Sequence, residues 1–231
     1  MGYTCSMELY HLINHSIEGH DLFLDSQDCA RLVHNLYEFN DTRPADNLHR
    51  LFDPRMKDLR GLSFRRARNR LVEVHGWCLM KDHYHLLISE LVEGGLLKFM
   101  MKVNVGYAKY YNERYRRHGY VFRGKTKKIL LGNDAHFLYI LHYIHLNPLD
   151  YLTGATKWRE RDKHGIKSAK KALEYLSGYR WSSYQDYCGK KNFPSLITTN
   201  LFGGMFGNYQ DAIVDYLKGA ESFSTLDLIL E

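Results

Sequence analysis

Two apolar runs separated by only two residues constrain this chain more than any other feature. Residues 71–80 are LVEVHGWCLM and residues 83–89 are HYHLLIS. Both are rich in the aromatic and aliphatic side chains that strands favour. Lys81-Asp82 between them predicts a tight turn, although it lacks the strongest hairpin dipeptides. The two runs therefore predict neighbouring antiparallel strands, around which the other elements have to be arranged.

The segments on either side predict alternating strands and helices. Residues 7–15 predict a strand, and Asp25-Ser26 predicts the start of a helix over 27–39. Further along, apolar spacing predicts a helix, a short strand and another helix, over residues 96–117, 127–131 and 135–147. Proline cannot continue a helical hydrogen-bond ladder, so Pro148 ends the last helix. This order predicts an α+β fold with a ferredoxin-like βαββαβ core, an antiparallel sheet with helices on one face, and an additional C-terminal helix.

The length of 231 residues suits one sizeable domain with appendages, or at most two small domains. We predict a domain over residues 1–190, with polar and basic insertions at about 40–70 and 150–176. Residues 191–231 are predicted to form a helical tail, with a final helix near 208–219.

Compartment and membrane association are constrained by what the sequence lacks. No apolar run approaches the roughly 20 residues that span a bilayer, and the N-terminus has no secretory pattern. We expect a cytoplasmic protein with no membrane partner. The four cysteines form no CxxC pair and no zinc spacing, so free thiols are predicted at Cys5, Cys29, Cys78 and Cys188.

The charge favours a polyanionic partner. The net charge is +6 and the isoelectric point is about 9.0. Basic side chains gather near 65–70 and 157–171, and a third group is interleaved with aromatic residues between 110 and 128. Such mixing suits a surface that follows phosphates and stacks unpaired bases, although a solvated face is the competing interpretation. The candidate DNA-binding residues are Arg114, Arg116, Arg117, Arg123, Lys125, Lys127 and Lys128.

His83-Tyr84-His85 is the first chemical candidate. Residues i and i+2 of a strand point to the same face, about 6.6–6.8 Å apart along the strand. Two imidazoles so placed can converge on one metal ion. On its own, however, such a pair is more often two ordinary histidines on a strand face.

The second candidate is the pair Tyr143 and Asn147 in YIHLNP. Four residues apart on a helix, their Cβ atoms lie about 5–6 Å from each other. The carbonyl oxygen of Asn147 can serve as a metal ligand, with the Tyr143 hydroxyl one turn away. Taken alone, a core tyrosine and a helix-ending asparagine before Pro148 explain the pattern better.

Together these motifs resemble the REP-associated tyrosine transposases, within the single-tyrosine HUH transposases. The matching stretches stand in the family's order between residues 10 and 187: YHLINHSIEGHDLF (10–23), HGWCLMKDHYHLLI (75–88), YNERYRRHGYVFRGK (111–125), YILHYIHLNPLDYL (139–152) and YRWSSYQDY (179–187). Three departures are Asp82 where the family usually has Asn, His15 where it often has Arg, and Thr126 in place of an aromatic residue.

The resemblance implies a chemistry and its residues. Tyr143 is the expected nucleophile, and His83, His85 and Asn147 are the expected ligands of a divalent ion, Mg²⁺ or Mn²⁺. Residues 1–190 become a catalytic domain that cleaves and transfers single-stranded, hairpin-containing DNA through a 5′-phosphotyrosine. We expect a monomer rather than a homodimer.

Three alternatives stay open at this point. The first is a catalytically silent, domesticated DNA-binding protein of transposase origin. The second is a different metal-dependent enzyme, such as a hydrolase using His83 and His85, although no third strong ligand stands at a suggestive spacing. The third is a structural or interaction protein whose histidines are incidental.

Overall fold

A computed structural model describes residues 8–44, 68–132, 134–160 and 166–219. Its strands are β1 (Leu9–His15), β2 (Val72–Leu79), β3 (His83–Glu90) and β4 (Lys127–Leu130). Its helices are α1 (Ser26–Glu38), α2 (Gly95–Arg114), α3 (Asp134–Leu146), α5 (Ala169–Gly178), α6 (Tyr184–Tyr187), α7 (Asn200–Gly203) and α8 (Tyr209–Leu217). Three short 3-10 helices are η1 (Ile17–Gly19), η4 (Asn147–Tyr151) and η5 (Trp158–Glu160).

The four strands form one sheet in the order β2-β3-β1-β4, and every neighbouring pair is antiparallel. The predicted mixed class with an antiparallel sheet is therefore confirmed. The strand–helix–strand–strand–helix–strand succession is present from β1 to β4. In the centre of the sheet, His15 lies opposite His83 and Ile13 lies opposite His85. This register brings the histidines of β1 and β3 onto one face, because side chains alternate along each strand.

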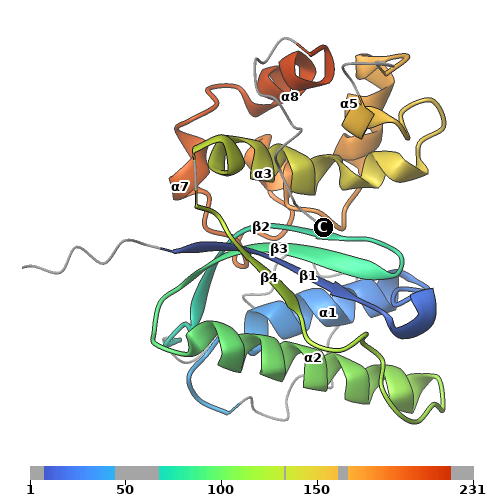
Figure 1. Cartoon of the computed structure of the whole chain (residues 1–231), viewed down its shortest axis with the longest axis vertical. Helices are drawn as coiled ribbons and strands as arrows, with labels where there is room; N and C mark the ends of the chain where they lie inside the picture. The colour runs from blue at the N-terminus through green and yellow to red at the C-terminus, as the bar shows by residue number, and fades with distance from the viewer. Residues whose placement is uncertain (1–7, 45–67, 133, 161–165, 220–231) are drawn as a thin grey trace, which may run out of the picture.

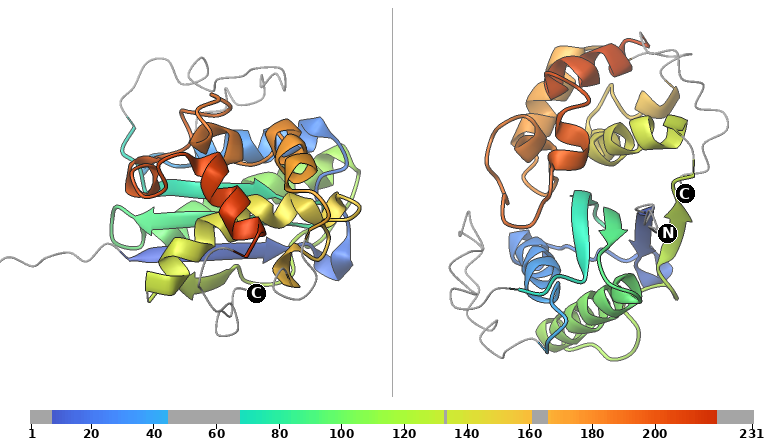
Figure 2. Two further views of the ribbon diagram at one scale, coloured as in Figure 1. Left: turned by 90° about the horizontal axis from the view of Figure 1, so that it is seen from above. Right: turned by 90° about the vertical axis from the view of Figure 1, so that its left-hand side faces the viewer.

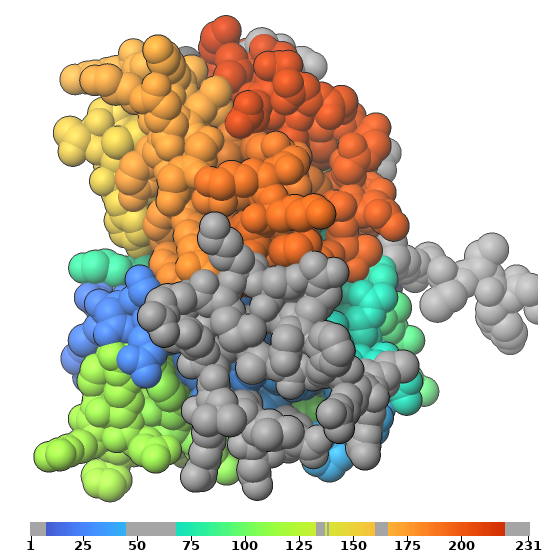
Figure 3. Space-filling view, turned by 180° about the vertical axis from the view of Figure 1, so that it is seen from behind, coloured from blue at the N-terminus to red at the C-terminus, as the bar shows by residue number. Residues whose placement is uncertain are grey.

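The sheet is covered on both faces. Helices α1 and α2 pack beneath it, and α3 with the later helices packs above it (Figures 1 and 2). The same division is visible from behind, where the orange and red C-terminal residues form the upper half (Figure 3). Each layer has its own apolar core, one centred on α1 and α2 and one on α3. The additional helix predicted from the sequence thus lies opposite the two helices of the βαββαβ unit.

The predicted insertions and tail are only partly within the described residues. Positions 45–67 and 161–165 lie outside them, as does Cys5. The described part of 191–231 contains α7 and α8, which share the α3 core, so this part packs with the proposed catalytic domain. The division at residue 190 stays a prediction. Cys29, Cys78 and Cys188 are free thiols, and no described helix is both long and apolar enough to cross a membrane.

The outer edge of β2 is covered by the segment from Trp181 to Ser183. The Leu79 amide donates to the Trp181 carbonyl at 2.9 Å, and the Ser183 amide donates to the Trp77 carbonyl at 3.0 Å. These bonds satisfy backbone groups that an open sheet edge would leave exposed. The Ser183 hydroxyl also lies 2.7 Å from His145 Nε2. The same segment therefore covers the sheet edge and anchors α3.

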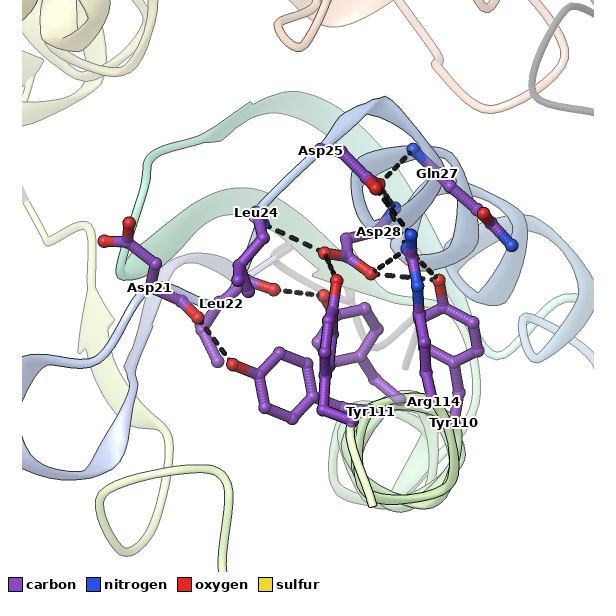
Figure 4. Close-up of polar contacts among 11 residues, drawn as sticks. Asp21, Leu22, Leu24, Asp25, Gln27, Asp28, Tyr110, Tyr111 and Arg114 are labelled. Carbon is purple, nitrogen blue, oxygen red and sulfur yellow. Dashed lines mark hydrogen bonds and ion pairs between the residues drawn. The ribbon is translucent and has the colours of Figure 1, made fainter. Parts of the chain in front are cut away.

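A buried carboxylate connects the two lower helices (Figure 4). Asp28 of α1 is fully buried and accepts hydrogen bonds from Tyr110 Oη at 2.9 Å and Arg114 Nη1 at 2.6 Å. It also accepts from the Leu24 amide at 2.9 Å and from Tyr115 Oη at 2.7 Å. A buried charge is tolerated only when it is paired and hydrogen-bonded, and Asp28 meets both conditions.

We predict that Asp28→Ala lowers the free energy of unfolding by about 3 kcal/mol, because it leaves the Arg114 charge and two phenol groups without their shared acceptor. Urea unfolding followed by circular dichroism measures the change. Lys109→Ala, which removes an exposed charge from α2, the helix that carries Arg114, is the control and should change the free energy by less than about 0.5 kcal/mol. Equal losses in both variants would contradict this role of Asp28.

His75 gives the fold a pH dependence. It belongs to β2 and is buried, with Nε2 2.7 Å from Ser89 Oγ of β3 and Nδ1 3.3 Å from the Thr198 carbonyl. Burial lowers the pKa of His75, and the nearby Glu73 charge only partly offsets this. The folded chain therefore resists a proton that the unfolded chain accepts below about pH 6.5.

We predict that the stability contributed by His75 is fully present above about pH 6.5 and decreases as the pH falls below it, by at most about 1.4 kcal/mol per pH unit. His75→Gln should be less stable than the parent at pH 7.5, and the difference should narrow by pH 5.5. Urea titrations of both proteins at the two pH values measure this. Other buried histidines are common to both proteins and cancel in the comparison. A difference that stays constant or widens would contradict the prediction.

Candidate active site

Four histidines of β1 and β3 lie on the sheet face that α3 covers. His11 and His15 come from β1, and His83 and His85 come from β3. Nε2 of His83 is 3.1 Å from Nε2 of His85, and Nδ1 of His85 is 3.0 Å from Nε2 of His11. The predicted pair therefore converges nitrogen to nitrogen, with a third imidazole directly behind it.

Burial keeps the inner imidazoles neutral. His85 is fully buried, and burial together with the neighbouring histidines holds its pKa well below the ordinary value. Burial, helped by the charge of Lys127, lowers the pKa of His11 to about 3. Neutral imidazole is the form that binds metal ions, because the ligand nitrogen must carry a lone pair. The two converging Nε2 atoms thus suit a divalent cation.

His83 is oriented by Asp82, whose carboxylate oxygen lies 2.7 Å from Nδ1. With Nδ1–H donating to that carboxylate, Nε2 keeps its lone pair on the side of His85. The His15 ring stacks on His83 with 4.7 Å between centroids. Potential ligand atoms of His15, Asp82 and His83 all lie within 4.8 Å of one another. His15 and Asp82, the two residues that differ from the pattern of the resembled family, therefore both lie beside His83 and add possible metal donors.

Tyr143 meets this cluster from α3. Its ring centroid is 5.8 Å from that of His85 and 5.9 Å from that of His11, and both contacts are edge-on. The Tyr143 ring also contacts the Trp158 ring, with 5.7 Å between the two centroids. Tyr143 is only 3% exposed. Helix α3 thus brings the predicted nucleophile next to the imidazole pair, within one chain.

Asn147 follows α3 and uses both ends of its amide inside the chain. Nδ2 donates to the Tyr143 carbonyl at 2.8 Å, and Oδ1 accepts from Arg159 Nη2 at 2.6 Å. The oxygen predicted to bind metal is directed to a guanidinium here. Arg159 also donates to Asp150 at 2.6 Å, and its guanidinium carbon lies 5.5 Å from the Tyr143 ring centre.

Sequence reasoning missed His11 and Arg159. His11 carries a weak sequence signal. It stands two residues from Ile13 in β1, so the two side chains lie on one face of the strand, and Ile13 is the residue opposite His85. Arg159 carries none beyond its place in a basic stretch. The neighbouring histidines of α3 are structural: His145 lies 2.7 Å from Tyr209 Oη, and His142 stacks on Tyr216 at 5.3 Å.

The predicted basic residues divide into different environments. Arg114 pairs with Asp25 and Asp28, so its charge serves the contact between α1 and α2. Lys127 lies opposite Ile13, which puts it on the histidine face of the sheet, whereas Lys128 lies on the other face, 4.3 Å from the Tyr10 ring centre. Side chains exposed to solvent belong to Arg116, Arg123, Lys125, Lys127 and Lys128.

Comparison with known proteins places part of this chain. The family model described as "Transposase IS200 like" matches residues 49–145, a range that includes both predicted ligand histidines and Tyr143. No curated protein matches the chain. Among solved structures, a REP-associated tyrosine transposase bound to a REP hairpin is similar to this chain with 10% identity and a TM-score of 0.46, over 86% of this chain and 89% of that one. The family comparison thus confirms, over residues 49–145, the predicted resemblance of this chain to transposases.

Proposed function

We propose that this chain cleaves and rejoins single-stranded, hairpin-containing DNA through a covalent bond to Tyr143. The observation that carries the proposal is the contact between the rings of Tyr143 and His85, whose centroids lie 5.8 Å apart although the two residues are far apart in the sequence. The match to an IS200-like transposase family supports a DNA-processing enzyme. Because one chain supplies both the tyrosine and the histidines, we propose that a monomer suffices.

His83 and His85 would hold a divalent cation, with Mg²⁺ and Mn²⁺ as the candidates. When bound, such an ion neutralises and polarises the non-bridging oxygens of a phosphodiester. Asp82 sets the tautomer of His83, and His11 faces the second ring nitrogen of His85. Asn147 is the third ligand that the family resemblance implies, and its oxygen becomes available once Arg159 releases it.

The proposed reaction is balanced and reversible. The Tyr143 phenol oxygen bonds to phosphorus while the bond to the 3′ oxygen breaks, which leaves a 5′-phosphotyrosine and a free 3′ hydroxyl. The phenol proton passes to solvent and the departing oxygen takes one up. Attack by another 3′ hydroxyl reverses these changes and joins strands without an external energy source.

The exposed basic residues of β4 and of the segment before it form the surface along which the single-stranded DNA would bind. Lys127 projects on the histidine face at the β4 edge of the sheet, and Lys125 and Arg123 precede it in the chain. We propose that these residues, with Arg116, Arg117 and Lys128, contact phosphates. Arg114 is excluded from this set because Asp25 and Asp28 hold it.

One observation favours a second candidate function. Tyr143 is 3% exposed, so its phenol has to become accessible before a phosphate can reach it. A domesticated DNA-binding protein that has lost cleavage would keep the tyrosine as part of the core. Formation of a covalent adduct separates the two candidates.

We predict that His83→Ala and His85→Ala each weaken Mn²⁺ binding by more than about tenfold, the loss that even an indirect partner of a metal ligand causes. Isothermal titration calorimetry on the metal-free protein measures the affinity, and thermal unfolding checks that each variant is folded. His118→Ala, which removes an exposed histidine, is the matched control. Undiminished binding by His85→Ala, together with loss in His15→Ala, would place the ion with His15, Asp82 and His83 instead.

We predict that Tyr143→Phe abolishes covalent adduct formation while hairpin binding stays within about threefold, because only the attacking oxygen is removed. A pool of labelled hairpins with randomised single-stranded flanks, incubated with Mn²⁺ and run on a denaturing gel, reveals the adduct. Tyr139→Phe, one turn earlier on the same helix, is the control and should still form it. An adduct in the Tyr143→Phe variant would refute the assignment. A parent protein that binds hairpins without an adduct would favour the second candidate.

A further inference from the structure

Arg159 is a cation that contacts both the proposed nucleophile and a proposed metal ligand. Its guanidinium lies against the Tyr143 ring and donates to the Asn147 oxygen at 2.6 Å. It comes from η5, in the basic insertion that the sequence leaves without a function, and it stands outside the range matched by the family model. Its position therefore calls for a role of its own.

The guanidinium is fixed and charged. Its second donor bonds to Asp150 at 2.6 Å, and its carbon lies 4.3 Å from the ring centre of the buried Trp158. Burial opposes the charge, but the hydrogen bond and charge of Asp150 outweigh it, so the pKa of Arg159 is raised. Its electrostatic influence also extends to His85. A cation held in this way does not have to be reorganised when negative charge arrives.

The guanidinium can also be reached. The Arg159 side chain is 34% exposed, in contrast to the buried Tyr143 beside it. Its acceptor Asp150 is charged, whereas its acceptor Asn147 is neutral. A phosphate oxygen is a stronger acceptor than an amide oxygen for this guanidinium, because it adds the attraction of opposite charges and can share a bidentate pair of N–H bonds. An arriving phosphate can therefore replace Asn147 at Nη2 while Asp150 retains Nη1.

We propose that Arg159 is a catalytic residue that binds the scissile phosphate beside Tyr143, and that this exchange releases the Asn147 oxygen towards the imidazole pair. The inference rests on the proposed strand cleavage and deepens it. It assigns a direct substrate contact to the insertion over 150–176. It also links arrival of the DNA to completion of the ligand set, because one side chain holds the amide until the phosphate is present.

The first experiment measures adduct formation. We expect Arg159→Gln to slow it by about 10²–10³-fold, the effect of removing one donor from a developing oxyanion. Arg159→Lys should recover part of the loss, since it restores charge without the planar fork that bonds two oxygens. Lys157→Gln makes the same charge change at an exposed neighbour and should stay within about threefold of the parent. Equal adduct rates in the parent and Arg159→Gln would overturn the inference.

The second experiment separates phosphate contact from a merely structural role. The adduct made by the parent locates the scissile linkage. A hairpin with a neutral methylphosphonate at that linkage is then compared with the unmodified hairpin, in Tyr143→Phe and in Tyr143→Phe/Arg159→Lys. The modification should weaken binding at least about tenfold more when Arg159 is present. If the role of Arg159 were only structural, its substitution would weaken binding to both hairpins equally. That result would refute the proposed contact.

The outcomes distinguish the two proposals. Absence of an adduct in the parent would remove the proposed cleavage, and the role of Arg159 would fall with it. An adduct in the parent, with no difference between the two hairpins that depends on Arg159, would overturn only the inference about Arg159. The Arg159→Lys variant keeps a cation beside Asp150, so the binding comparison remains possible if Arg159→Gln fails to fold.

Discussion

The position of α3 against the upper face of the sheet is the constraint on which the whole site depends. The histidines belong to the sheet, whereas Tyr143 belongs to this helix and reaches them through its packing. Two contacts hold the helix down. His145 lies between Ser183 at the sheet edge and Tyr209 of α8, and the helix packs its apolar residues onto β2 and β3. Removing either partner of His145 would leave a buried polar group without a hydrogen bond, which is costly. The geometry of the tyrosine is therefore set by residues that do no chemistry themselves.

The local elements could be predicted because their causes are local. The strands over 71–80 and 83–89 were indicated by apolar runs, and the structure has them at Val72–Leu79 and His83–Glu90. Asp25 was expected to cap a helix, and its side chain accepts from the amides of Gln27 and Asp28. Such signals depend on a few neighbouring residues. The face on which α3 would pack was not among them, because it depends on contacts with segments 40 to 70 residues away.

The sequence predicted which residues belong to the candidate site better than it predicted the contacts between them. The convergence of His83 and His85 follows from strand alternation, and the structure shows their nitrogens 3.1 Å apart. The contact between Asn147 and Arg159 could not be deduced, since it depends on how η4 and η5 turn back across the end of α3. The same limit applies to Arg114. The basic residues around it predicted a contact with DNA, but its charge is paired with the carboxylate of Asp28, 86 residues away in the chain. A cluster of basic residues in the sequence therefore indicates a DNA-binding surface only for those side chains that are not already paired with acceptors inside the fold.

The packing of α8 on α3 has a consequence for how the molecule is made. The sheet and its lower helices are complete by residue 130, whereas Tyr209 and Tyr216, which contact α3, are synthesised some 80 residues later. During synthesis the N-terminal part of a chain leaves the ribosome first. A nascent chain therefore presents its imidazoles well before its phenol is secured beside them. Tyr143 is therefore secured beside the imidazoles only after the residues of α8 have been synthesised.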